Sequence, residues 1–281
     1  DVVVIGGGPG GYAAAIRASQ LKGKVALVEG GNMGGTCVMR GCIPSKIWLR
    51  AATLLEQSHK AAEFGLELTV GKLDYTAVLA RKQGVSNDIR MGMEALLANN
   101  GVDVIPGMAV VTSPTSVDVA GKKIEAKNII IATGSTLAKP DVPGLDQAAF
   151  TTDQLLDMEK APASVLITDP TYIGVEMATL LSILGSKVIY AVPGPRILPD
   201  EDQDSSQRMS QSLRERGVQI IARHTLVKVA GKTCTLKSGD KEQTVEADRV
   251  LVSGRKPVAA NLGLEALGVK FNEDGGIAVD Q

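Results

Sequence analysis

Two cysteines, Cys37 and Cys42, lie five residues apart in the segment GGTCVMRGCIPSK. They stand at the start of a predicted helix, and Gly41 and Pro44 allow its first turn to be distorted so that the two sulfurs approach bonding distance. The positive end of a helix dipole and a nearby cation such as Lys46 favour the thiolate, which is the reactive form. The spacing therefore predicts a redox-active dithiol.

Two alternatives to a dithiol stay open at this point, a metal site and a pair of inert buried thiols. No second cysteine pair or histidine cluster accompanies the motif, and His59 and His224 are remote from it in sequence, so we predict no metal. Inert thiols would leave the surrounding glycines unexplained. Cys234 is predicted to be an ordinary strand residue.

The opening stretch VVVIGGGPGGYAAAIRASQLKGKVALVEGG has the pattern of a strand, a glycine-rich turn, a helix and a second strand. Such a βαβ unit predicts an α/β fold with a parallel sheet and helices on its faces. Helical spacing continues over 44–64 and 75–99, and short strands follow. The proline-rich stretch 137–146 indicates a connection between two domains.

The turn of this unit carries a GxGxxG spacing made by Gly6, Gly8 and Gly11, and Glu29 ends the second strand. Gly6 permits a tight turn, Gly8 lets the backbone approach a pyrophosphate, and Gly11 lets helix and strand pack closely. Glu29 can accept hydrogen bonds from both hydroxyls of a ribose. The motif predicts an ADP-containing dinucleotide without distinguishing FAD from NAD, and a tight turn without a ligand is the alternative.

The unit recurs in the chain, since a constant shift of 163 residues lays VVVIGGGPGG on VLITDPTYIG and KVALVEG on KVIYAVP. The second copy keeps only the packing glycine of the motif. Its four matching positions are Asp169, Thr171, Gly174 and Val192.

These replacements predict that the second copy binds NAD(H) poorly. Thr171 places a β-branched side chain where a pyrophosphate would meet backbone, Asp169 brings negative charge to the same place, and Val192 cannot accept the ribose hydroxyls. Asp and Thr are also good N-cap residues. Three lost contacts of about 1–3 kcal/mol each would weaken binding by several orders of magnitude. The alternative is that the backbone shifts and binding persists. Binding of NADP is expected even less, because its 2′-phosphate requires several arginines after the second strand and only Arg196 is present there.

Taken together, these motifs resemble the flavin-dependent pyridine nucleotide-disulfide oxidoreductases of class I. The cysteine motif is most similar to that of the dihydrolipoamide dehydrogenases, followed by the mercuric reductases. The segments IIIATGS at 129–135, RILP at 196–199 and VLVSGRKP at 250–257 match the family as well, so the likeness covers essentially the whole chain.

The resemblance implies two Rossmann-like dinucleotide-binding domains, with a C-terminal dimerisation domain absent from this chain. The FAD-binding domain would comprise 1–141 plus 258–281, incomplete in its C-terminal half, and the NAD-binding-like domain 142–257. In the family the further domain supplies a His five residues before a Glu, a spacing that neither His59 nor His224 has. We therefore expect the chain to be part of a longer protein, homodimeric if that domain exists.

The resemblance also assigns roles to residues. Cys37 would attack the disulfide or dithiol substrate, Cys42 would lie beside the flavin, and Lys46 would lie near its reactive edge. Residues expected to contact FAD are Gly6, Gly8, Pro9, Gly11, Glu29, Gly35, Thr36, Lys46, Ala109, Ala132, Thr133, Gly134, Ser135 and Arg255. The degraded NAD site would comprise Asp169, Thr171, Tyr172, Gly174, Glu176, Val192 and Gly254, of which Tyr172 and Glu176 match the family's nicotinamide gate and a neighbouring acid.

The predicted activity is the passage of two electrons between FAD and a dithiol or disulfide such as a lipoyl group. Reduction of mercuric ion or of another disulfide is an alternative within the family. An alternative of another class is an FAD-binding electron-transfer or assembly subunit that works with a protein redox partner, as the altered second site would allow.

Composition narrows the partners. The chain has 281 residues and a formal net charge of −1, from 30 basic and 31 acidic residues, which gives no reason to expect nucleic acid or an anionic membrane as a partner. No apolar run reaches the roughly 18–20 residues that span a bilayer. We therefore expect a cytoplasmic protein.

Overall fold

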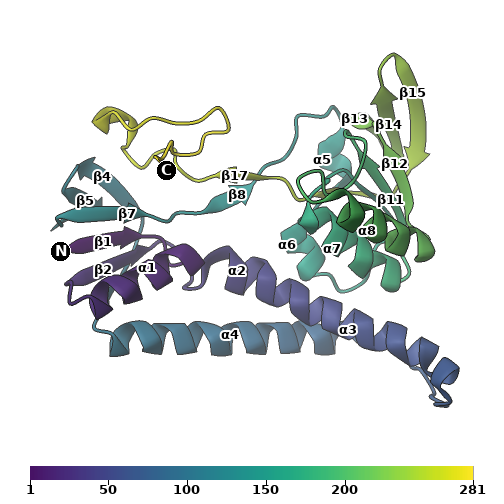
Figure 1. Ribbon diagram of the computed structural model, residues 1–281, viewed down its shortest axis with the longest axis horizontal. Helices are drawn as coiled ribbons and strands as arrows, with labels where there is room; N and C mark the ends of the chain where they lie inside the picture. Colours follow the sequence, from purple (N-terminus) through teal and green to yellow (C-terminus); the bar gives the residue numbers. More distant parts are fainter. Residues whose placement is uncertain (281) are drawn as a thin grey trace. The chain divides into compact units, whose positions relative to one another are not determined.

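The computed structural model describes residues 1–280, and the chain divides into two compact units. Figure 1 labels most of their helices and strands. Unit 1 comprises Asp1–Pro44, Lys82–Thr136 and the stretch from Arg255 onward. Unit 2 comprises Ser45–Arg81 and Leu137–Gly254. Each unit contains a parallel sheet with helices, which confirms the predicted fold class.

Unit 1 is built on a four-stranded parallel sheet of order β3-β2-β1-β7. The strands are β1 (Val2–Ile5), β2 (Val25–Glu29), β3 (Asp103–Pro106) and β7 (Asn128–Ile131). Helix α1 (Pro9–Gln20) connects β1 to β2 in the predicted βαβ unit. Successive residues of β1 point to opposite faces, so Val3 and Ile5 belong to one apolar cluster and Val4 to another.

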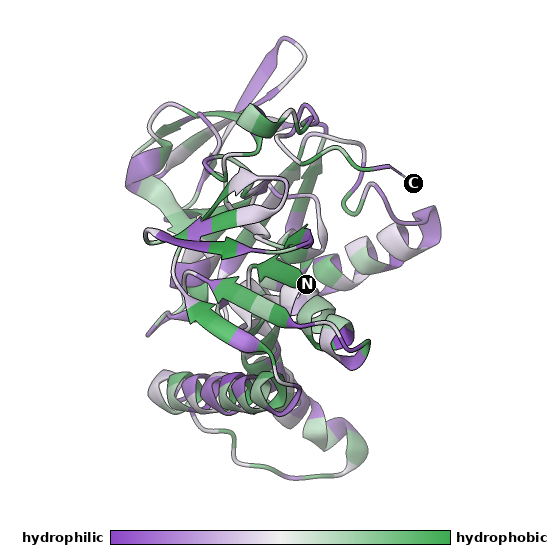
Figure 2. Ribbon diagram, turned by 90° about the vertical axis from the view of Figure 1, so that its left-hand side faces the viewer, coloured by the Kyte–Doolittle hydropathy of each residue, from purple (hydrophilic) through white to green (hydrophobic). Residues whose placement is uncertain are grey.

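Each face of this sheet is covered by a different part of unit 1. The face of Val3 packs against Val111 and Val117 of an antiparallel sheet formed by β4 (Ala109–Ser113), β5 (Ser116–Val119) and β6 (Lys122–Glu125). The face of Val4 packs against Ala15 of α1 and Leu97 of α4 (Tyr75–Asn99). Burial on both sides explains why the central strand β1 is apolar throughout, and green predominates in the strands of this sheet in Figure 2.

Unit 2 is built on a five-stranded parallel sheet of order β12-β11-β10-β16-β9. Its strands are β9 (Ala149–Thr151), β10 (Ser164–Ile167), β11 (Lys187–Val192), β12 (Gln219–Ala222) and β16 (Arg249–Val252). A three-stranded antiparallel sheet follows, of β13 (Thr225–Ala230), β14 (Thr233–Ser238) and β15 (Lys241–Glu246). The helices of this unit after residue 136 are α5 (Leu145–Ala148), α6 (Thr152–Leu156), α7 (Tyr172–Ile183) and α8 (Gln203–Glu215).

The remaining elements connect these layers. The segment after the first βαβ unit forms α2 (Gly35–Arg40) and α3 (Cys42–Lys60), and the short helix η1 (Ala61–Phe64) follows. Strands β8 (Ser135–Leu137) and β17 (Arg255–Pro257) form a two-stranded sheet, and η2 (Glu265–Leu267) lies near the end of the described chain. No helix within residues 1–280 is long and apolar enough to cross a membrane.

The internal repeat seen in the sequence is present in three dimensions. Helix α7 has the bounds of α1 shifted by 163 residues. The strand register follows the same shift, since Val2 pairs with Val25 in unit 1 and Val165 pairs with Val188 in unit 2. The likeness extends beyond the predicted βαβ units, because each unit adds a third parallel strand, an antiparallel three-stranded sheet and a returning parallel strand.

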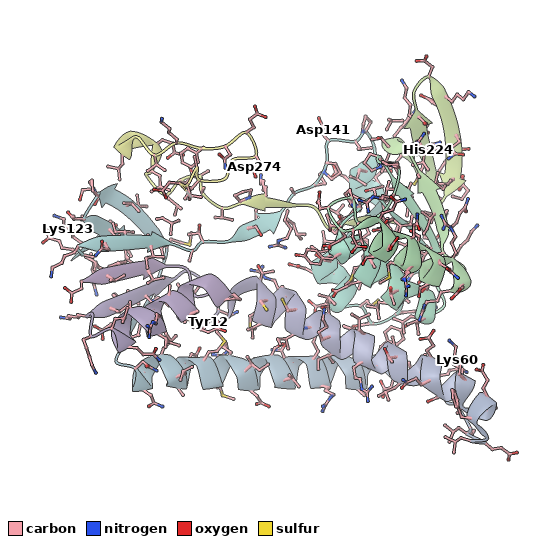
Figure 3. All side chains as sticks on the ribbon, in the orientation of Figure 1. Tyr12, Lys60, Lys123, Asp141, His224 and Asp274 are labelled. Atoms are coloured by element: carbon pink, nitrogen blue, oxygen red, sulfur yellow. The ribbon has the colours of Figure 1, made fainter. Side chains whose placement is uncertain are left out.

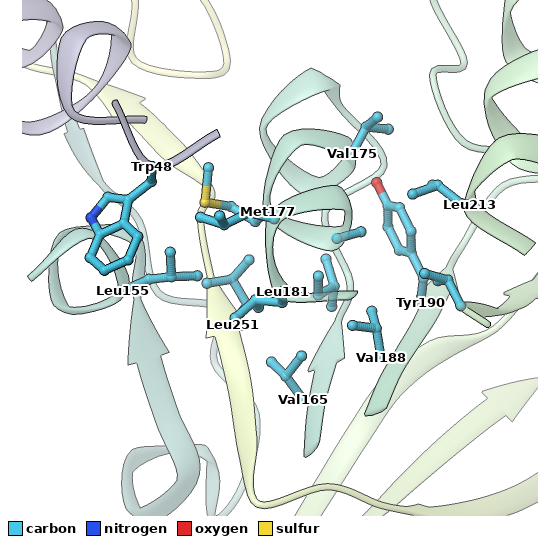
Figure 4. Close-up of a cluster of buried hydrophobic side chains, with 14 of the residues drawn as sticks. Trp48, Leu155, Val165, Val175, Met177, Leu181, Val188, Tyr190, Leu213 and Leu251 are labelled. Carbon is cyan, nitrogen blue, oxygen red and sulfur yellow. The ribbon is translucent and has the colours of Figure 1, made fainter. Parts of the chain in front are cut away.

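Residues 45–81 differ from the predicted division, which assigned them to the FAD-binding domain. In the structure they belong to unit 2 because Trp48, Ala52 and Val78 are buried in one apolar cluster with Leu155 and Val165. Figure 4 shows Trp48, Leu155 and Val165 of this cluster. The other unit boundaries fall at 136/137 and 254/255, near the predicted 141/142 and 257/258. Gln281, the last residue of the predicted FAD-binding domain, lies outside the described residues. The assignment of cofactors to domains stays a prediction.

Candidate functional site

Two glycines of the first loop are required by the packing of the protein itself. Gly6 has a φ of +107°, which side chains rarely adopt, and a Cβ there would overlap the carbonyl oxygen of Ala132. A Cβ at Gly11 would overlap the carbonyl oxygen of Gly6. These glycines therefore bring α1, the loop and the residues after β7 into close contact.

Gly8 differs, because no protein atom requires a glycine there. The nearest atom to an added Cβ is the Cα of Gly35, at 4.0 Å. Helix α1 begins next to it with no side-chain cap at Gly8, and α2 begins with none at Gly34. The Gly34 amide donates to the Gly7 carbonyl oxygen at 2.9 Å, which holds the starts of the two helices together. Open backbone beside two uncapped helix N-termini fits the pyrophosphate of a dinucleotide.

Glu29 ends β2 beside this loop and is half-buried. Its carboxylate accepts hydrogen bonds from the amide of Gly7 at 2.5 Å and from the amide of Gly31 at 2.6 Å. The carboxylate thus holds the glycine loop in place. Its contact with a ribose stays a prediction. The loop-fixing role has no motif of its own in the sequence.

Arg255 gathers several of the predicted FAD-binding residues. Its guanidinium donates to the Ser135 hydroxyl at 2.8 Å, to the Ser135 carbonyl oxygen at 2.6 Å and to the Thr36 hydroxyl at 3.2 Å. The Thr133 hydroxyl donates to the carbonyl oxygen of Val258. Residues from three distant segments of unit 1 therefore meet between the start of α2 and the residues that follow β7.

The other residues predicted to contact FAD occupy varied positions. The Ala132 amide donates to the Ile5 carbonyl oxygen at 2.8 Å, and the Gly134 carbonyl oxygen accepts from Val258 at 2.9 Å. Pro9 is the first residue of α1 and is exposed. Ala109 is buried in the apolar cluster beneath β4, where protein atoms enclose its side chain.

The two cysteines lie on either side of a helix break. Cys37 is half-buried in α2, and Cys42 is exposed at the first residue of α3. Gly41 separates the helices with φ −142° and ψ −103°, and a Cβ there would lie 3.1 Å from the Thr36 carbonyl oxygen. The sequence predicts one helix with a distorted first turn. The structure instead has two helices, because the backbone leaves helical geometry at Gly41.

Lys46 forms an ion pair with Glu176 within unit 2. Lys46 lies one turn after Cys42 on α3, and Glu176 lies one turn after Tyr172 on α7. The side chain of Lys46 is 60% exposed and that of Glu176 29%, and Tyr172 is 67% exposed. The sequence identifies these residues separately but does not predict the pairing, because 130 positions separate the two charges and no spacing rule relates them.

The second loop holds the predicted replacements in a folded arrangement. Thr171 is the N-cap of α7, and its hydroxyl accepts from the Ile173 amide at 3.3 Å. Asp169 accepts from the Thr171 amide at 2.8 Å, and a Cβ at Gly174 would overlap the Asp169 carbonyl oxygen. Val192 is fully buried at the end of β11. Gly254 accepts from the Ala138 amide at 2.7 Å.

Arg196 has another role than the binding of a 2′-phosphate. Its guanidinium donates to four main-chain carbonyl oxygens, those of Leu198, Pro199, Glu201 and Asp202. It fixes the turn before α8. With these contacts made, the Arg196 guanidinium gives no support to the binding of NADP.

Neither histidine lies in a cluster of potential metal ligands. His59 is in the last turn of α3, and His224 precedes β13, where its Nδ1 lies 2.8 Å from the Ala222 carbonyl oxygen (Figure 3). Within the described residues there is no group of three or more His, Cys, Asp or Glu side chains that could hold a metal ion.

Cys234 is expected to react far more slowly with iodoacetamide than Cys42 in the reduced native protein. Burial, with the nearby charge of Glu246, raises the pKa of the Cys234 thiol to about 11. At pH 8 about one molecule in 1,000 would then carry the thiolate, against about one in four for an ordinary thiol. Peptide mass spectrometry of timed samples should show labelling of Cys42 at least about 100-fold faster. Equal labelling of the two residues in folded protein would contradict the burial of Cys234.

The geometry defines a class of protein. One unit has an open glycine loop and two uncapped helix starts followed by a cysteine pair, and the other repeats its topology with a modified loop. This is the arrangement of a disulfide oxidoreductase with two nucleotide-binding-type domains. The sequence matches the family described as pyridine nucleotide-disulphide oxidoreductase over residues 1–281, so the chain belongs to that family. The match confirms the predicted family, its class of enzyme and FAD as the cofactor of that class.

Individual relatives agree with this assignment. The chain is 37% identical over 280 residues to a dihydrolipoyl dehydrogenase of Acholeplasma laidlawii, covering 97% of this chain and 82% of the relative. It is 31% identical to a mercuric reductase of Bacillus cereus, covering 100% of this chain and 46% of the relative. Among solved structures, the HOCl-induced flavoprotein disulfide reductase RclA from Escherichia coli superimposes with a TM-score of 0.81 at 30% identity. That match covers 100% of this chain and 62% of RclA.

Proposed function

We propose that the chain acts as an FAD-dependent dithiol/disulfide oxidoreductase similar to dihydrolipoyl dehydrogenase. The observation that carries the proposal is the placement of Cys37 and Cys42 on either side of the break between α2 and α3, with the start of α2 next to the open loop of Gly8. The same α2 begins with Gly35 and Thr36, so one short helix joins the predicted flavin contacts to the first cysteine.

The cofactor would be held by residues already grouped in unit 1. The open backbone at Gly8 and the uncapped starts of α1 and α2 would take the pyrophosphate, Glu29 the ribose, and the cluster around Arg255 the later part of the molecule. Bound there, FAD supplies a two-electron redox centre. Lys46, held by Glu176, contributes a positive charge one turn from Cys42.

The cysteines would exchange electrons with the substrate by thiol–disulfide exchange. In the direction of substrate reduction, the Cys37 thiolate attacks one sulfur of the substrate disulfide, the S–S bond breaks, and the other sulfur leaves as a thiolate that takes up a proton. Cys42 then attacks the mixed disulfide at Cys37 and releases the second substrate thiol. The substrate gains two electrons, and Cys37 and Cys42 become a disulfide. The reverse sequence oxidises a dithiol.

The substrate and assembly are narrower parts of the proposal. A lipoyl-type dithiol is favoured by the dihydrolipoyl dehydrogenase relatives, while the likeness to mercuric reductase and RclA supports other electron acceptors. Because the chain spans only 46% to 62% of several relatives, a homodimer and a cytoplasmic location also belong to the proposal. The alternative of an electron-transfer or assembly subunit with a protein redox partner is favoured by Asp169 and Thr171 in the second loop.

Anaerobic reduction of the flavin-loaded protein with one equivalent of dithionite tests the proposal. The wild-type protein is expected to develop a long-wavelength absorbance band from a thiolate beside oxidised flavin. Cys42→Ser should show no such band at any stage. Cys37→Ser should show it before dithionite is added, because its flavin-side sulfur has no disulfide partner, and the two electrons should then reduce the flavin and remove the band. Cys234→Ser is the matched control and should behave as wild type, since this residue is buried in unit 2. A Cys42→Ser protein that keeps the band would overturn the assignment.

A further inference from the structure

The loop between β10 and α7 is held closed by its own side chains. One oxygen of the Asp169 carboxylate accepts from the Thr171 amide at 2.8 Å, and the other accepts from the Ser253 hydroxyl at 2.6 Å. The hydroxyl of Tyr190, on the neighbouring strand β11, donates to the Asp169 carbonyl oxygen at 2.6 Å. Asp169 is therefore bonded through its backbone and through both of its carboxylate oxygens.

The first copy shows what this network replaces. Asn128 pairs with Val2 in unit 1, and Arg249 pairs with Val165 in unit 2, so the returning strands are related by a shift of 121 residues. By that shift Ser253 is the counterpart of Ala132, the residue whose carbonyl oxygen lies against Gly6. Glycine beside alanine in the first copy has become aspartate hydrogen-bonded to serine in the second. The two positions have changed as a matched pair.

The backbone of the loop has changed with its side chains. Gly6 adopts a φ of +107°, whereas Asp169 is not among the non-glycine residues with positive φ in the described chain. The second loop therefore does not reproduce the backbone geometry that a glycine supplies at the first position of the motif. The backbone at Asp169 thus differs from the backbone at Gly6, and the hydrogen bonds of the Asp169 side chain hold it in its altered conformation.

Two of the amide donors that an open loop would offer to phosphate are occupied. The Thr171 hydroxyl caps α7 by accepting from the Ile173 amide, whereas α1 has no side-chain cap at Gly8. The amide of Thr171 itself donates to the carboxylate of Asp169. A phosphate would have to displace both acceptors and to approach a carboxylate of its own sign.

Buried residues around the loop stabilise the hydrogen bonds of Asp169. Tyr190 is fully buried, and burial together with the charge of Asp169 raises its pKa, so its hydroxyl remains a donor to the loop. Ser253 is 3% exposed, so its hydroxyl has little access to water and relies on the carboxylate. Val192, the counterpart of Glu29, is fully buried in the core, which leaves no carboxylate for a ribose at that position.

We infer that unit 2 excludes NAD(H), and that Asp169, Ser253 and Thr171 are the residues that exclude it. The Asp169 carboxylate satisfies from within the protein the amide that would otherwise bind a pyrophosphate. The family's nicotinamide nucleotide thus does not fit this loop, and unit 2 is a folded scaffold that presents Glu176 to Lys46. This inference goes beyond the proposed function, which requires only the cysteines and the flavin site of unit 1.

Isothermal titration calorimetry with NADH tests the inference on the flavin-loaded protein. Wild type is expected to show no saturable binding up to about 1 mM, a limit that corresponds to about 4 kcal/mol of binding free energy. The triple variant Asp169→Gly, Thr171→Gly, Ser253→Ala copies the residues of the first loop into the second. The variant lacks the Asp169 carboxylate and the Thr171 cap, and it also lacks the Ser253 hydroxyl, which would otherwise have no acceptor. It should bind NADH with a dissociation constant at least about tenfold below the wild-type limit of about 1 mM.

The single variant Ser253→Ala is the matched control, because it keeps the Asp169 carboxylate and the Thr171 cap, and it should remain without saturable binding. Circular dichroism establishes that each variant is folded. Saturable binding of NADH by wild type below about 1 mM overturns the inference, whether or not the triple variant folds. A folded triple variant that gains no binding overturns the assignment to these three residues. None of these results depends on Cys37 or Cys42, so a failure here is distinct from a failure of the proposed function.

Discussion

Replacing Trp48 by Ala is expected to lower the free energy of unfolding of unit 2 by about 3–5 kcal/mol. Trp48 is fully buried on α3, and Figure 4 shows its ring beside Leu155 in the apolar cluster that also contains Met177. Its indole Nε1 donates to the Leu156 carbonyl oxygen at 2.8 Å, and its ring lies 5.4 Å from that of Tyr75. Truncation removes the packing, the hydrogen bond and the ring contact at once.

Trp48→Phe is the matched control, because it keeps an aromatic ring in the cluster and loses the hydrogen bond. A loss of about 1–2 kcal/mol is expected. The chain has a single tryptophan, so fluorescence would disappear with the substitution, and urea unfolding should be followed by circular dichroism. The midpoint of the unit 2 transition is the quantity to compare, because two units need not unfold together. A loss below about 1 kcal/mol for Trp48→Ala would contradict the packing of α3 in unit 2.

The repeated architecture was predictable from sequence because it depends on local order. A strand, a turn and a helix each have a characteristic period, and the shift of 163 residues carries Pro9 at the start of α1 onto Tyr172 at the start of α7. The helices predicted at 44–64 and 75–99 match α3 with η1 and α4 for the same reason. The preference of Thr171 for an N-cap is likewise a local property, and the structure shows that cap.

Contacts between distant segments were not predictable, because they depend on which strands and helices become neighbours. Ser253 and Asp169 are 84 positions apart and meet only because β16 lies beside β10. Lys46 and Glu176 are 130 positions apart and lie on different helices. The membership of 45–81 in unit 2 has the same origin, since an apolar helix face indicates burial but not the partner that buries it.

The two loops separate what a glycine motif does for the fold from what it does for a ligand. Gly11 and Gly174 are both required, because a Cβ at either would overlap the carbonyl oxygen of the first loop residue. Gly8 has no such constraint, and its counterpart Thr171 is accommodated without one. A motif position that the packing leaves free can therefore change once its ligand contact is no longer selected. In this chain the first loop keeps that free position as glycine and the second does not.

Gly11→Ala is accordingly expected to damage both the stability and the cofactor site of unit 1. The new Cβ would overlap the backbone carbonyl oxygen of Gly6, so α1 must move away from the loop that is to hold FAD. A loss of about 3 kcal/mol in the free energy of unfolding is expected, with at least about a tenfold weaker retention of FAD. Urea unfolding of the flavin-free protein and equilibrium titration with FAD measure the two effects separately.

The adjacent Gly10→Ala provides the control on the same helix. Its added Cβ meets no protein atom within 4 Å, and Gly10 is exposed, so the substitution reduces the flexibility of the unfolded chain without a clash. Stability should stay within about 1 kcal/mol of wild type or rise slightly. If Gly10→Ala and Gly11→Ala were equally destabilising, the effect would come from the loss of any glycine in this turn. A large difference between the neighbours, as expected, assigns it to the contact between α1 and the Gly6 carbonyl oxygen.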